Sequence, residues 1–139
     1  MRDRLYLPVG NLDGCARRLL IALGLIVVCA SPAIAGPDTD VSEGAVIFQQ
    51  QCVTCHTVAP GASGMMAPNL RGLLGRKAGS TEFGYSAALK NSQIVWSAKT
   101  LDKFLMAPSK LVPGTRMPVS ISDRDIRRKV IAYLLSLDK

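Results

Sequence analysis

Apolar residues recur at helical spacing near the start of the segment 36–139. They follow one another at intervals of four, three and four residues: Val41, Ala45, Phe48 and Cys52. Such spacing places their side chains on one face of a helix. Asp40 is a suitable N-cap, and Glu43 lies three positions on, as in a capping box. The pattern therefore predicts a helix that begins at Asp40 and carries one apolar face to Cys52.

A second apolar face runs to the C-terminus. The stretch Ser122-Asp123-Arg124-Asp125 repeats the capping pattern. The apolar positions then follow at helical spacing: Ile126, Val130, Tyr133, Leu134 and Leu137. Two terminal helices with one apolar face each can pack together. Gly44 lowers helix propensity in the first of them, so it is either simply tolerated or allows the other helix to approach closely.

Between these helices the chain is mostly loop. Residues 58–80 hold seven glycines and prolines among short apolar segments. A short helix is predicted over 86–91, and Ser97 can cap a longer one that Pro108 ends. Its buried side is expected to hold Leu101, Phe104 and Leu105. Since no segment has a convincing strand pattern and no internal repeat is present, the sequence predicts an all-α fold.

Residues 1–35 differ in character from the rest of the chain. Four arginines in residues 1–18 precede an apolar run, and Ala33-Ile34-Ala35 has the small-x-small pattern that signal peptidase reads. We therefore expect an export signal that is cleaved before Gly36. Cleavage would leave 104 of the 139 residues, enough for one domain over 36–139 and too few for two.

The alternative is an uncleaved membrane anchor. Residues 19–35 form a stretch of 17, at the lower edge of the roughly 17 to 25 residues that span a bilayer. Membrane association through this stretch therefore stays open beside the cleaved, periplasmic form.

The charge balance is basic but scattered. Of 17 Lys and Arg residues four lie in residues 1–35, and of ten Asp and Glu residues two do, so 13 against eight remain, a net +5. Such a surface can attract an acidic protein, an anionic membrane or nucleic acid. No Lys/Arg-rich tract is present, few aromatic side chains could stack on bases, and an exported protein meets little nucleic acid. We therefore expect no nucleic-acid partner.

Candidate chemistry is concentrated in Cys52-Val53-Thr54-Cys55-His56. Two cysteines separated by two residues and followed at once by histidine are what covalent haem attachment requires. The thiols of Cys52 and Cys55 would add to the haem vinyl groups, and His56, the only histidine, would bind iron from one face. A zinc site would need a second ligand pair that the chain lacks. The rival is a redox-active dithiol, which expects a βαβ context.

The sixth iron position must go to methionine, lysine, water or nothing. Met65 and Met66 follow His56 too closely to reach the other face of the haem easily. Met106 is expected to lie on a structural helix and to fill part of the hydrophobic core. Met117 lies 61 residues beyond the histidine in a loop bounded by Pro113 and Pro118, and it is the predicted ligand.

With these residues in view, the chain resembles the class I cytochrome c family over its whole length from residue 36. Four segments carry the resemblance, in the family's order and separations: 44–56, 67–77, 83–96 and 113–117, followed by 131–134. The resemblance implies a fold of about four to five short helices and loops around one covalently attached haem c, with the terminal helices packed together. Phe104 and Leu89 stand where many mitochondrial members have tyrosine and asparagine.

The resemblance also implies roles around the haem. The Pro68 carbonyl would accept the Nδ1 proton of His56 and orient its ring. A buried haem propionate needs hydrogen-bond donors, and these would be Arg76, Tyr85 and Trp96. Thr115 would hold the loop of Met117.

A haem iron with both axial positions filled offers no site for substrate, which favours electron transfer over catalysis. We expect a periplasmic electron carrier without enzyme activity, working between respiratory or photosynthetic proteins. Its partners would be redox proteins with acidic docking surfaces, such as an oxidase, a reductase or a reaction centre, and the haem attachment machinery. The resemblance implies that four basic residues lie near the haem edge and could steer such partners: Lys77, Lys99, Lys110 and Arg116. The alternatives are a membrane-anchored cytochrome c subunit and a haem enzyme or gas sensor with a labile sixth ligand.

Overall fold

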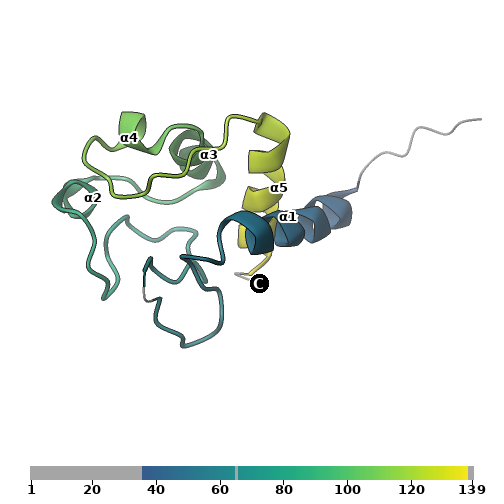
Figure 1. Cartoon of the computed structure of the whole chain (residues 1–139), viewed down its shortest axis with the longest axis horizontal. Coiled ribbons are helices and arrows are strands. Elements are labelled where there is room, and N and C mark those ends of the chain that lie inside the picture. Colours follow the sequence, from purple (N-terminus) through teal and green to yellow (C-terminus); the bar gives the residue numbers. More distant parts are fainter. Residues whose placement is uncertain (1–35, 65, 138–139) are drawn as a thin grey trace, which may run out of the picture. The chain divides into compact units, whose positions relative to one another are not determined.

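The computed structural model describes residues 36–64 and 66–137. Figure 1 shows their helices, which are α1 (Pro37–Gln51), α2 (Ala87–Asn91), α3 (Ala98–Met106), α4 (Pro108–Leu111) and α5 (Arg124–Ser136). The described part of the chain has no strand, only an isolated antiparallel bridge between Lys77 and Val95. The predicted all-α class is confirmed. None of the helices in these two ranges is both long and apolar enough to cross a membrane. The predicted signal or anchor, residues 1–35, lies outside the described residues.

The start of the first helix was predicted wrongly. α1 begins three residues before Asp40, with Gly36 as an N-cap that offers no side-chain bond and proline at the start of the helix. Proline is well suited to that place because its missing N–H would have no partner there. Asp40 therefore lies inside the helix and is free to form an ion pair with Arg128 of α5. The cap predicted at Ser97 is confirmed at the start of α3. Ser86 caps α2, and Asp123, within the predicted capping stretch 122–125, caps α5.

The terminal helices cross at Gly44. A Cβ at this glycine would lie 2.0 Å from the backbone oxygen of Lys129 and 2.9 Å from Cβ of Tyr133. One turn further along α1, Phe48 is 1% exposed and its ring lies 5.4 Å from that of Tyr133, centroid to centroid. The close approach explains the glycine, because a side chain here would push the two backbones apart.

Ion pairs at the edge of this crossing add to the apolar contact. The Lys129 ammonium lies 2.6 Å from a Glu43 oxygen of α1 and 2.7 Å from an Asp125 oxygen of its own helix. Hydrogen bonds to those carboxylates raise the pKa of Lys129. Since these groups are near the surface, the pairs should respond to salt.

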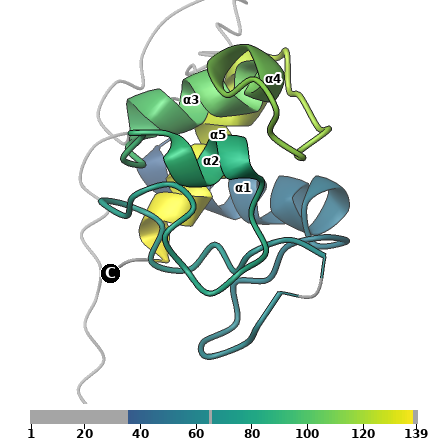
Figure 2. The same ribbon diagram turned by 90° about the vertical axis from the view of Figure 1, so that its left-hand side faces the viewer.

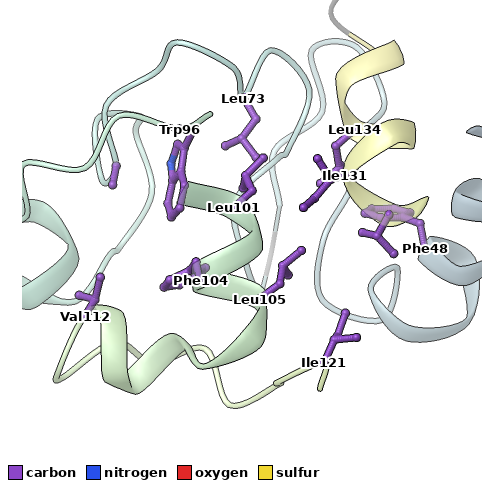
Figure 3. Packing of buried hydrophobic residues seen from close by; sticks show 12 residues of the cluster. Phe48, Leu73, Trp96, Leu101, Phe104, Leu105, Val112, Ile121, Ile131 and Leu134 are labelled. Atoms are coloured by element: carbon purple, nitrogen blue, oxygen red, sulfur yellow. The ribbon is translucent and has the colours of Figure 1, made fainter. Parts of the chain in front are cut away.

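The core lies between α5 and α3. Figure 3 shows Leu101 and Leu105 reaching from α3 toward Ile131 and Leu134 of α5, with Trp96 at the other side of α3. Trp96 packs edge-on against Phe104 at 5.1 Å between ring centroids. The predicted buried side of α3, Leu101, Phe104 and Leu105, is confirmed. Met106 was expected in the core, but it is 48% exposed because it falls on the opposite face of α3.

The stretch from the end of α1 to α2 consists of loops, as predicted for residues 58–80. Figure 2 shows it winding without a helix below α2. Gly79 takes a φ of +70°, and a Cβ there would lie 2.8 Å from Cα of Lys90 in α2. Only a glycine lets this loop bend so tightly against that helix.

Candidate functional site

The two cysteines and the histidine form a turn that continues from α1. The amide of Cys52 donates to the Phe48 carbonyl at 2.9 Å, and the amide of His56 donates to the Cys52 carbonyl at 2.9 Å. The apolar face of α1 therefore leads directly into the motif. Cys52 is half-buried and Cys55 is exposed, and both are free thiols.

The ring of His56 is held by a backbone carbonyl. Its Nδ1 lies 2.8 Å from the Pro68 oxygen, and the amide of Leu70 donates to the Thr57 carbonyl at 2.9 Å. A bonded Nδ1–H leaves Nε2 as the nitrogen with a lone pair for a metal. Burial lowers the pKa of His56, although the bond to Pro68 opposes the shift. The neutral imidazole that iron requires is therefore the favoured form.

The thiols do not have the character of a redox dithiol. Burial, and next the neighbouring Cys55, raise the pKa of Cys52. Redox-active pairs of this spacing instead lower the pKa of one thiol so that it attacks as a thiolate. Together with the absence of strands from the described residues, this disfavours the βαβ dithiol class.

Two residues that the sequence analysis missed shape the loop below His56. The Asn69 amide donates to the carbonyls of Ala59 and Ala62, both at 2.8 Å. The Arg71 guanidinium donates to the carbonyls of Val58 at 2.7 Å and Leu137 at 3.2 Å, which ties the loop to the end of α5. An asparagine directly after the proline that bonds the histidine was the available signal.

Of the three predicted propionate donors, Arg76 and Trp96 lie on neighbouring segments. Arg76 donates to the carbonyls of Arg71 and Asn69, each at 3.1 Å, and its own carbonyl accepts the Trp96 amide at 2.9 Å. The Tyr85 hydroxyl lies 2.6 Å from that of Thr81. The backbone bonds thus bring Arg76 and Trp96 together, whereas Tyr85 bonds a neighbour in its own loop.

Met117 sits in the extended segment between α4 and α5. Its amide donates to the Thr115 hydroxyl at 3.5 Å, and the Thr115 amide donates to the Val112 carbonyl at 3.0 Å. Met117 is half-buried and packs against the core. Cys52, in the segment that carries His56, does the same.

The residues present fit a haem. Free thiols at the required spacing and a histidine with a bonded Nδ1 could supply attachment and one axial donor. The thioether of the half-buried Met117 could supply a second. Partly buried apolar side chains pack against the core from both ligand-bearing parts of the chain: Val58 and Leu70 after His56, and Ala88, Leu89, Ile94 and Leu111 before Met117. An apolar disc inserted there would meet apolar surface.

Comparisons with known proteins agree with this geometry. The family model described as cytochrome c matches residues 41–138. The cytochrome c of Theileria annulata is 43% identical over 104 residues, covering 74% of this chain and 90% of its own. That of Tetrahymena pyriformis is 44% identical over 108 residues, covering 76% and 96%.

A solved structure gives the same result. Cytochrome cH from Methylobacterium extorquens superposes with a TM-score of 0.65 at 35% identity, over 70% of this chain and 98% of that protein. The predicted class I cytochrome c fold is therefore confirmed. The chain belongs to the cytochrome c family and is an electron carrier, not an enzyme, with one covalently attached haem c for which Cys52 and Cys55 have the required spacing.

Proposed function

We propose that this protein carries single electrons between redox proteins in the periplasm, with its haem attached through Cys52 and Cys55 and its iron held by His56 and Met117. The bond between His56 Nδ1 and the Pro68 oxygen carries the proposal, because it fixes the ring with Nε2 available to iron. When bound, the haem supplies an iron that alternates between Fe(II) and Fe(III). The chain supplies two axial donors, so no position is left for a substrate.

The thioether of Met117 sets the character of the carrier. A soft sulfur donor favours the reduced iron and raises the reduction potential relative to a second nitrogen donor. Thr115 holds the Met117 amide, which restricts where the sulfur can lie. A ligand held in the same place in both oxidation states lets the electron move with little rearrangement of the protein.

Arg76, Tyr85 and Trp96 are proposed to hold a haem propionate. Arg76 is half-buried and always charged, and its guanidinium already bonds two carbonyls. A propionate placed there would be paired with a fixed positive charge. Trp96 is 7% exposed, so its indole N–H would act away from bulk water. Tyr85 is half-buried as a residue, and its hydroxyl lies at the exposed side of the loop with Thr81.

The proposed ligand set is tested by replacing Met117 with alanine. The weak absorption band between methionine sulfur and ferric iron should disappear, and external ligands should bind. Met106→Ala is the matched control, because Met106 is exposed on α3 and should leave the band unchanged. If Met106→Ala removes the band and Met117→Ala does not, the assignment is wrong. Rapid carbon monoxide binding by the native ferrous protein would instead favour a sensor or haem enzyme.

Docking is proposed to use the basic side chains of Lys77, Lys99, Lys110 and Arg116, all of which are exposed. They would steer acidic surfaces of an oxidase, a reductase or a reaction centre onto the haem edge through a small, short-lived interface. The rate of electron transfer to such a partner should fall as ionic strength rises. A rate indifferent to salt would reject electrostatic steering.

Residues 1–35 are proposed to act as a signal peptide, leaving 36–139 as the single mature domain. A protein tethered through residues 19–35 is the second candidate, favoured by the 17-residue length of that stretch. Separating periplasm from membrane and measuring the intact mass distinguishes the two. A mature mass that starts at Gly36 supports cleavage, and a membrane-bound full-length chain supports the tether.

A further inference from the structure

Arg127 is the only charged residue that is buried among the residues the structure describes, with 4% of its surface exposed. It lies on α5 and faces α3, where its Nε donates to Asp102 at 2.7 Å. Nη1 donates to the carbonyls of Ile121 at 2.9 Å and Ser122 at 2.8 Å. One side chain thus joins two helices and the segment that follows Met117.

The backbone bonds of that segment are gathered at Ile121 and Ser122. Ile121 is 6% exposed, and its amide donates to the Leu105 carbonyl of α3 at 2.8 Å while its carbonyl accepts from Arg127. The residues between Met117 and Ile121 are all exposed. A chain of four residues reaches at most about 14 Å, so the place of Ile121 limits the place of Met117.

Stability alone does not explain a guanidinium here. Removing this charge from water is costly, and an apolar side chain of similar size often serves a core equally well or better. Asp102, its partner, is 40% exposed and could be hydrated without it. What an apolar residue could not do is donate to two successive carbonyls of the loop while it is pinned to α3.

We propose that Arg127 is a positioning residue that fixes the C-terminal half of the Met117 loop and thereby retains the methionine at the iron. Thr115 fixes the N-terminal half by bonding the Met117 amide. The inference rests on the Met117 ligation proposed above. Loosening the anchor at Ile121 should let Met117 leave the iron more often, without opening the contact between α1 and α5.

The test uses the haem-containing protein and three variants at two adjacent arginines. Imidazole is added to the ferric protein, and the rate at which it displaces the methionine is followed by loss of the sulfur-to-iron band. Arg127→Met removes both charge-assisted hydrogen bonds to the loop. It should accelerate displacement by at least about tenfold, because one such bond alone is worth roughly that factor. Arg127→Lys keeps the charge and should restore part of the difference.

Arg128→Met is the matched control. Arg128 lies on the same helix and pairs with Asp40 and Asp125, but no bond joins it to the loop among those described. Arg128→Met should change the stability measured by denaturant unfolding. The rate at which imidazole displaces the methionine should stay within about twofold of the native rate. If Arg127→Met fails to incorporate haem, Arg127→Lys decides, with faster displacement than the native protein as the supporting result.

The two proposals fail separately. If Met117→Ala removes the band but the Arg127 variants exchange at the native rate, only the positioning role is overturned. The same role is overturned if Arg128→Met accelerates displacement as much as Arg127→Met, because the effect then follows general stability. If Met117→Ala keeps the band, the ligand assignment itself is wrong.

Discussion

Replacing Gly44 with alanine tests the closest contact in the fold. On an exposed helix this change stabilises by about 1 kcal/mol, because alanine has the higher helix propensity. Here the new methyl carbon would lie 2.0 Å from the Lys129 backbone oxygen, and a backbone group cannot move aside as a side-chain tip can. The helices must therefore separate, and the packing of Phe48 on Tyr133 must change with them.

The two effects have opposite signs, and their sizes decide the result. Overpacking a well-filled contact costs about 1 to 3 kcal/mol, and a clash with backbone belongs at the upper end. After the gain in helix propensity is subtracted, we expect a net loss of about 2 kcal/mol. For a domain of this size that corresponds to a melting temperature lower by roughly 10 °C.

The assay is reversible denaturant unfolding of the haem-containing protein, followed by circular dichroism. Gly84→Ala is the matched control, because a Cβ at Gly84 would meet nothing within 4 Å. Its effect should stay within about 0.5 kcal/mol. A Gly44→Ala protein that binds haem and is as stable as the native one would refute the close crossing of α1 and α5.

The other predictions concern the helix cap, the ion pairs and the haem. Ser97→Ala should lower the free energy of unfolding by about 1 kcal/mol, since the Ser97 hydroxyl accepts the Thr100 amide at the start of α3; an unchanged denaturation midpoint would contradict this. Lys129→Met should destabilise the protein less in 1 M salt than in dilute buffer, because the ion pairs are screened. Since the pKa of Lys129 is raised, its contribution is complete below the ordinary lysine value and is lost as the pH rises through the raised one. The difference between Lys129→Met and native protein should therefore persist at neutral pH and shrink only at alkaline pH. A chain with both Cys52 and Cys55 replaced by alanine, produced without haem, should be largely unstructured, and cooperative melting of that chain would contradict the expectation.

The helices could be predicted because their signals are local. The cap at Ser97, the capping stretch 122–125 and the spacing of Leu101, Phe104 and Leu105 act within a few residues. The structure has a cap at Ser97 and another at Asp123 within that stretch, and it buries the three apolar residues. The start of α1 was missed because Asp40 has the side chain of a cap, whereas its partner Arg128 lies 88 positions away. The apolar periodicity also did not show whether Met106 is buried. A short helix does not define which positions at the edge of its apolar face are covered.

Long-range polar contacts could not be predicted either, because their partners lie far apart in the sequence. In the sequence, Arg127 does not differ from the other cations of a basic helix. Only the fold brings Asp102 and two loop carbonyls to it. The role of Arg71 likewise becomes visible only in the folded loop, and the only sequence signal for Asn69 was its place directly after Pro68. The haem motif was found because its chemistry depends on spacing within five residues.

Both proposed ligands lie outside the helices, so their positions depend on individual hydrogen bonds. His56 depends on a carbonyl of a loop that Asn69 and Arg71 hold, and Met117 depends on Thr115 before it and Arg127 after it. The helices contribute indirectly, because α3 and α5 present the groups to which the loops bond. A carrier must change oxidation state without rearranging, so its ligands need fixed positions even though they sit on loops. Polar side chains that bond backbone groups of the loops meet this need, and apolar packing, which lacks direction, cannot replace them.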